Sequence, residues 1–157
     1  MQIKLPYDTS KPIAGEASIE INKSIQEVFD YIGVNFFENY PKWADDVVVF
    51  EPFNGNEIFI GAQAKQVRSD NGEVVESVFE IIDYQPNYKL VFQGLTAPYR
   101  NSYLVEKAQA ALSTRLIFRF ELLEIEIFMW PFQKLIRVAI EDGAENIVGN
   151  LEKLLAA

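Results

Sequence analysis

Five polar side chains stand where the predicted strands alternate toward the protein interior: Gln66, Ser77, Tyr99, Asn101 and Tyr103. Their hydroxyl and carboxamide groups donate and accept hydrogen bonds, and a tyrosine or a buried carboxylate can also move a proton. A buried polar group without a partner costs roughly 1–3 kcal/mol. Several such groups together indicate either a hydrogen-bonded network or a cavity in which water or a ligand satisfies them.

Composition restricts any other chemistry. The 157 residues include no histidine and no cysteine, so the usual general base, the usual metal ligand and a thiolate nucleophile are all missing. We interpret the doublet Asp45-Asp46, near the predicted mouth of the interior, as an ordinary solvated loop pair. No phosphate loop, dinucleotide fingerprint, Gly-x-Ser-x-Gly elbow or calcium loop occurs. Any chemistry would therefore fall to Asp, Glu, Tyr, Lys or Arg, or to a cofactor, and we single out no catalytic residue, no metal site and no cofactor.

The net charge of −9, from 14 basic and 23 acidic residues, argues against nucleic acid and against docking on anionic lipid. No run of 18 apolar residues exists, so we expect no stable membrane insertion. The first residues have no apolar segment typical of a secretory signal, and the lack of cysteine fits a cytoplasmic protein.

The elements that must position the polar groups follow from periodicity. Residues 16–21 alternate as a half-buried strand, and Ser24 to Glu27 form a capping box that opens a short helix. A second short helix is expected in the aromatic stretch 35–43. Alternation and the turn signals Asn54-Gly55 and Asn71-Gly72 then predict a meander of antiparallel strands. Its strands cover residues 47–51, 58–68, 73–84, 88–94, 99–106 and 114–121.

A long amphipathic helix is predicted over residues 131–155, with Pro131 at its first position. Its apolar face should lie on the sheet. Gly143, in the middle of this helix, costs about 1 kcal/mol against alanine, and we expect it to allow close approach to the sheet or an aromatic ring. Residues 1–157 are thus expected to form a single α+β domain. It would have a seven-stranded curved antiparallel sheet, two short helices and a long C-terminal helix.

Two interpretations of the interior stay open at this point. It can be a solid core with a few tyrosine hydroxyls at its rim, or a cavity between the sheet and the long helix, which the small side chains of Ala62 and Ala64 favour. The aromatic stretch 35–43 either packs in the core or lines the mouth of a pocket. The cluster from Phe128 to Phe132 is core, the lip of a ligand entrance, or a contact for a membrane or partner.

The order of elements resembles the helix-grip fold of the START/Bet v 1-like superfamily, in particular its bacterial polyketide cyclase/dehydrase and lipid-transport-like group. The resemblance covers residues 14–155. It is carried by residues 24–32 after a strand, 40–43 before the next, Gly61, and residues 79–86 and 150–155. These segments mark a fold and not a substrate.

The resemblance implies an apolar small molecule held between sheet and long helix, with no catalytic residue that can be carried over. The candidate ligand-binding residues are Phe36, Tyr40, Trp43, Ala62, Ala64, Gln66, Ser77, Phe79, Phe92, Tyr99, Asn101, Tyr103, Phe118, Phe120, Ile136, Ile140 and Gly143. The leading hypothesis is binding or transport of a lipid, isoprenoid or polyketide-like molecule. The alternatives are a cyclase or dehydratase-type enzyme, and a protein-interaction module that docks a partner through its aromatic cluster or a strand edge.

Overall fold

A computed structural model describes residues 12–110 and 112–156 of the chain. The N-terminal residues on which the argument against a secretory signal rests lie outside this range. Seven antiparallel strands form one sheet in the order β1-β7-β6-β5-β4-β3-β2. The strands are β1 (Ile13–Ile21), β2 (Val47–Asn56), β3 (Gln63–Asp70), β4 (Glu73–Gln85), β5 (Lys89–Gly94), β6 (Tyr99–Lys107) and β7 (Thr114–Leu122).

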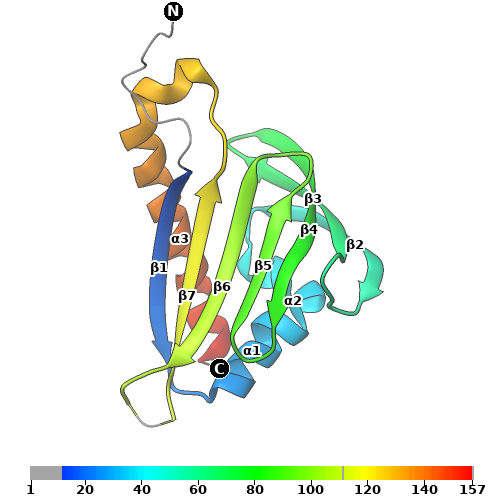
Figure 1. Ribbon diagram of the computed structural model, residues 1–157, viewed down its shortest axis with the longest axis vertical. Coiled ribbons are helices and arrows are strands. Elements are labelled where there is room, and N and C mark those ends of the chain that lie inside the picture. Colours follow the sequence, from blue (N-terminus) through cyan, green and yellow to red (C-terminus); the bar gives the residue numbers. More distant parts are fainter. Residues whose placement is uncertain (1–11, 111, 157) are drawn as a thin grey trace, which may run out of the picture.

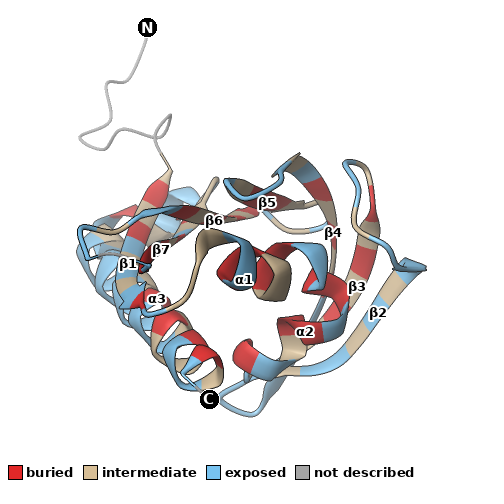
Figure 2. Ribbon diagram, turned by 90° about the horizontal axis from the view of Figure 1, so that it is seen from below, coloured by how far each residue is buried: buried red, intermediate tan, exposed pale blue. Residues whose placement is uncertain are grey.

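The helices all lie on one side of this sheet, which curves around them (Figure 1 and Figure 2). They are α1 (Ile25–Phe29), which continues into the π-helix η1 (Asp30–Val34), α2 (Phe36–Trp43), the 3-10 helix η2 (Ile127–Phe132) and α3 (Gln133–Leu155). Register shifts in β2 and β4 add local bends to the sheet. The α+β helix-grip architecture predicted from the sequence is therefore confirmed.

Local signals located several elements correctly. The Ser24 hydroxyl caps α1 by accepting a hydrogen bond from the Glu27 amide at 3.1 Å. Asn71 and Gly72, with φ of 49° and 84°, make the two-residue turn between β3 and β4.

The strand prediction for residues 58–62 was wrong. Ile60 is 60% exposed, and Gly61 has φ of +98°, so β3 begins only at Gln63. The doublet Asn54-Gly55 is likewise no hairpin turn, because it lies inside β2.

The C-terminal helix also differs from its prediction at one end. Pro131 lies in η2 and not at the first position of α3, which begins two residues later. Buried residues gather on α1, α2 and the C-terminal part of α3 (Figure 2), and the N-terminal half of α3 contributes none. The two halves of α3 therefore contribute differently to the core.

Within the part of the chain described, no helix is both long and apolar enough to cross a membrane.

Candidate functional site

A pocket of about 440 Å3 separates the N-terminal half of α3 from the inner face of the sheet. Its apolar wall comes from β7 and α3, and its polar wall comes from α2, β3, β6 and the connection between α2 and β2. The lining residues are Tyr40, Ala44, Asp45, Asp46, Gln66, Arg68, Tyr99, Asn101, Tyr103, Phe118, Phe120, Leu122, Ile136, Ala139, Ile140, Gly143, Ala144, Asn146 and Ile147. Such a mixture of apolar surface and a few convergent polar groups is typical of small-molecule sites.

Gly15 in β1 explains how α3 is held across the sheet. A Cβ atom at this position would lie 2.9 Å from Ile140 Cγ2 and 3.0 Å from the backbone nitrogen of Glu141. The absence of a side chain therefore lets the helix backbone rest directly on the strand. The contact sits at one edge of the sheet, and α3 spans the pocket from there.

Gly143 does not have the role expected from the sequence. Apart from its two chain neighbours and the backbone of its own helix, no atom of the described residues lies within 4 Å of a Cβ built at this position, so the glycine is not required for close approach to the sheet or to a ring. Gly143 shares the helical face of Ile136, Ile140 and Ile147, which also line the pocket. Its missing side chain leaves pocket volume open.

Aromatic side chains fill the other part of the interior. The ring of Phe36, on α2, lies with its centroid 5.0 Å from that of Tyr40 and 5.4 Å from that of Phe92. The rings of Phe79 and Phe92 pack with centroids 4.2 Å apart, and Ala62 and Ala64 belong to the same buried cluster. The interior thus combines the two alternatives left open by the sequence: solid core beneath α2, and a pocket beneath α3.

The predicted site residues divide along this boundary. Ten of them line the pocket: Tyr40, Gln66, Tyr99, Asn101, Tyr103, Phe118, Phe120, Ile136, Ile140 and Gly143. The remaining seven are not pocket-lining: Phe36, Trp43, Ala62, Ala64, Ser77, Phe79 and Phe92. Sequence reasoning did not name nine lining residues as site residues: Ala44, Asp45, Asp46, Arg68, Leu122, Ala139, Ala144, Asn146 and Ile147.

Three polar side chains of the wall, together with Ser77 behind it, form a continuous hydrogen-bonded chain. Tyr40 donates to Gln66 Oε1 at 2.8 Å, Gln66 Nε2 donates to the Tyr99 hydroxyl at 3.0 Å, and that hydroxyl lies 2.9 Å from Ser77 Oγ. Burial raises the pKa of both Tyr40 and Tyr99 above the ordinary tyrosine value, so both stay protonated near neutral pH. Each of these four side chains therefore has a hydrogen-bond partner within the network itself.

Tyr103 and Asn101 are less completely satisfied. The Tyr103 hydroxyl accepts a hydrogen bond from Trp43 Nε1 at 3.0 Å. Asn101 is 9% exposed, and its buried Oδ1 has no hydrogen-bond partner among the described residues. Burial raises the pKa of Tyr103 strongly, against a smaller lowering by hydrogen bonds with Trp43 and Asn101. Tyr103 is therefore a neutral donor throughout the physiological pH range.

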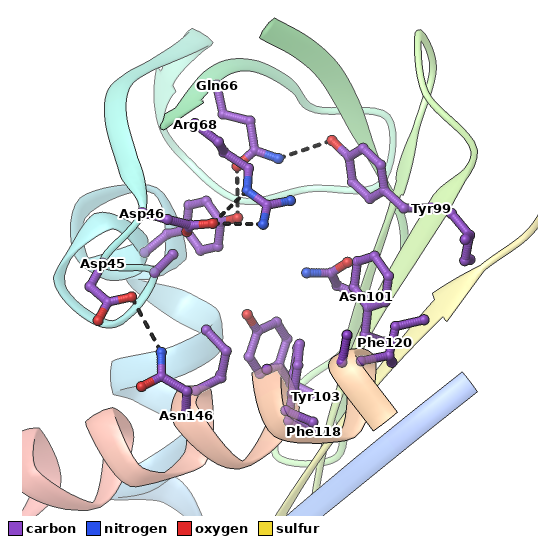
Figure 3. Close-up of a pocket in the computed structure, with 18 of the residues that line it drawn as sticks. Asp45, Asp46, Gln66, Arg68, Tyr99, Asn101, Tyr103, Phe118, Phe120 and Asn146 are labelled. Atoms are coloured by element: carbon purple, nitrogen blue, oxygen red, sulfur yellow. Dashed lines mark hydrogen bonds and ion pairs between the residues drawn. The ribbon is translucent and has the colours of Figure 1, made fainter. Parts of the chain in front are cut away.

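Charged groups stand at the rim of the pocket. Arg68 donates through Nε and Nη2 to Asp46 Oδ2, at 2.8 and 2.6 Å, and Asn146 Nδ2 donates to Asp45 Oδ1 at 3.3 Å (Figure 3). Burial acts to lower the pKa of Arg68, but the Asp46 carboxylate outweighs it and raises that pKa. The doublet Asp45-Asp46, interpreted from the sequence as solvated, is thus part of the rim.

The aromatic cluster from Phe128 to Phe132, in η2, was interpreted from the sequence as core, as the lip of a ligand entrance, or as a contact for a membrane or partner. Its residues do not all fit one of these interpretations. Trp130 is buried, and its Nε1 donates to the Ile125 carbonyl at 3.1 Å. Phe128 and Phe132 are 65% and 48% exposed, and neither lines the pocket. The core interpretation therefore holds for Trp130 alone, and the two phenylalanines do not form a lip of this pocket.

No protein-family model matches the sequence, and no curated protein matches it either. Solved structures do resemble it. A START superfamily protein from Mycobacterium smegmatis superimposes with a TM-score of 0.69 at 12% identity, over 90% of this chain and 96% of that one. Major latex-like protein 151 from Panax ginseng gives 0.64 at 10% identity, over 92% and 99%. The di-domain ARO/CYC StfQ of the steffimycin biosynthetic pathway gives 0.69 at 12%, over 92% and 50%.

Identities this low establish the fold alone. They agree with the resemblance stated from the sequence, because a START protein, a latex-like protein and an ARO/CYC protein share one architecture with this chain. The protein thus has the helix-grip fold of the START/Bet v 1-like proteins.

Proposed function

We propose that this protein binds or transports a hydrophobic small molecule, of the lipid, isoprenoid or polyketide-like kind, in the pocket between the sheet and α3. The observation that carries the proposal is the pocket itself, with apolar walls from β7 and α3 and convergent polar groups opposite them. The similarity to a START superfamily protein supports it.

The expected affinity follows from burial. A ligand that buries roughly 300 Å2 of apolar surface gains about 7.5 kcal/mol at ~25 cal/mol per Å2. Losses of translational and side-chain freedom oppose this gain, and hydrogen bonds to the polar wall add to it. Dissociation constants in the micromolar range are expected for a generic apolar probe. We propose that the protein works in the cytoplasm, a location that a chain without cysteine fits.

N-phenyl-1-naphthylamine, a neutral probe that fluoresces in apolar surroundings, tests the proposal directly. We expect saturable binding of one probe per chain, and native mass spectrometry of the purified protein should show an adduct that organic extraction removes. If the folded protein neither binds the probe nor carries an extractable adduct, it is not a carrier of hydrophobic molecules.

A cyclase or dehydratase-type activity is the second candidate. It is favoured by the fold shared with the ARO/CYC protein StfQ and by the buried phenol of Tyr103 in the pocket wall. The folded cavity would position a flexible substrate, and Tyr103 would donate a proton to a developing alkoxide. A Tyr103→Phe variant that binds substrate normally but turns none over would favour this activity over plain binding.

A further inference from the structure

Two hydrogen-bond donors converge inside the pocket and are not used up by the fold. Figure 3 shows the hydroxyl of Tyr103 and the amide nitrogen of Asn101 directed into the same open space. The Tyr103 oxygen accepts from Trp43, and none of the hydrogen bonds among the described residues uses the Tyr103 proton. The Asn101 amide carries two protons, and the interaction with Asn101 that helps to lower the pKa of Tyr103 uses at most one of them. Both groups can therefore donate to an acceptor in the pocket.

Asn101 is a polar residue at a buried position of the sheet where an apolar side chain would stabilise the fold better. Its partners on the neighbouring strands are Phe92 and Phe120, and its Oδ1 is buried without a hydrogen bond among the described residues. A carboxamide retained in such surroundings at a cost in stability points to a use outside the fold itself. The side of Asn101 that faces the pocket is its donor side.

We propose that the pocket recognises neutral apolar molecules through a carbonyl oxygen that accepts hydrogen bonds from Tyr103 and Asn101 together. This proposal rests on the proposed binding function and names the chemistry of its ligand. A carbonyl oxygen has two lone pairs and no proton, which suits two donors at one point. Trp43, held by α2, fixes the Tyr103 hydroxyl by donating to it, so the site is organised before the ligand arrives.

The rim explains why the ligand should be neutral. Asp45 and Asp46 place two carboxylates there against the single guanidinium of Arg68, and Asp46 already occupies Arg68 through two of its nitrogens. An anionic ligand would therefore meet net negative charge at the rim as well as the loss of its own hydration. A ketone carries no net charge, so it is not repelled at the rim, and the smaller cost of desolvating its oxygen is offset by the two donors.

Three ligands of similar shape test the proposal by competition with N-phenyl-1-naphthylamine: 2-acetylnaphthalene, the hydrocarbon 2-isopropylnaphthalene and the anion 2-naphthoate. In Tyr103→Phe and in Asn101→Leu, the affinity for the ketone should fall about 3- to 10-fold, the usual effect of one hydrogen bond. The affinity for the hydrocarbon should change less than about twofold, because apolar burial is retained. Tyr84→Phe is the matched control, since Tyr84 packs on Phe29 away from the pocket.

Retained binding of the hydrocarbon also shows that each variant is folded. The proposal is overturned if ketone and hydrocarbon lose affinity equally, or if the ketone loses none. In the unaltered protein, 2-naphthoate should bind at least about tenfold more weakly than the ketone, and equal affinity would overturn the requirement for neutrality. Failure of the naphthylamine probe to bind the unaltered protein would instead refute the proposed binding function.

Discussion

Gly143→Leu separates ligand binding from folding more cleanly than truncation of a core residue would. The glycine lies in the middle of α3, where replacement by leucine improves helix propensity by about 0.8 kcal/mol. Nothing within 4 Å opposes the new Cβ, and the side chain enters a pocket of about 440 Å3. Beyond Cβ it fills on the order of 100 Å3 at protein packing density, which is about a quarter of that volume.

The variant should therefore be more stable and bind less. A gain of about 1 kcal/mol raises the thermal midpoint by roughly 2–4 °C for a chain of this size. Binding of N-phenyl-1-naphthylamine, followed by fluorescence, should weaken at least about tenfold, since a bulky ligand cannot share the space with the leucine.

Gly149→Leu is the matched control for this experiment. Gly149 lies in the same helix, a Cβ added to it would also have no atom within 4 Å, and it does not line the pocket. This variant should gain the same helix propensity and bind the probe as the unaltered protein does. If both leucine variants bind the probe equally well, the probe does not occupy the space beside Gly143 and the assignment of the site is refuted.

Three further substitutions probe how the site is supported. Gly15→Ala should lower the free energy of unfolding by roughly 1–3 kcal/mol in urea melts, because the methyl group collides with the α3 backbone. Asn101→Leu should raise it by about 1 kcal/mol by removing an unpaired buried oxygen. Arg100→Met should cost about 1–2 kcal/mol at pH 7, since both oxygens of the buried Glu121 carboxylate accept from Arg100 at 2.8 Å. Hydrogen bonding to Arg100 lowers the pKa of Glu121 below its ordinary 4.5, so this difference should vanish as the pH falls below that lowered value.

The fold was predictable because its signals are local. Alternation, a serine N-cap and the Asn71-Gly72 turn each fix a few residues, and together they leave one compact arrangement of strands and helices. The errors occurred where a local signal had two meanings. Residues 58–62 alternate like a strand, yet the backbone at Gly61 adopts a positive φ, and Pro131 suits a 3-10 turn as well as the start of an α-helix.

The site was only half predictable, because its boundary is set by contacts between distant segments. Small residues at Ala62 and Ala64 suggested unfilled volume there, but both belong to the buried cluster that contains Phe36 of α2. No pattern in the sequence around Ala62 and Ala64 reveals which aromatic ring from a distant segment will pack over these two small side chains. Arg68 could have been found, since it lies two residues beyond Gln66 and therefore on the same face of β3.

The division of the interior explains how this chain can keep an open pocket. A cavity removes packing energy from the residues that line it, so its walls must be held by something other than each other. Here the aromatic cluster beneath α2 holds one wall, and Trp43 of that cluster reaches across to position Tyr103. On the opposite side, Gly15 adds no side chain of its own and so allows close contact with Ile140 and with the backbone of Glu141, which fixes α3 against β1. The packed core therefore supports the walls of the open pocket. A core residue, Trp43, also fixes the position of the Tyr103 hydroxyl that can donate to a ligand.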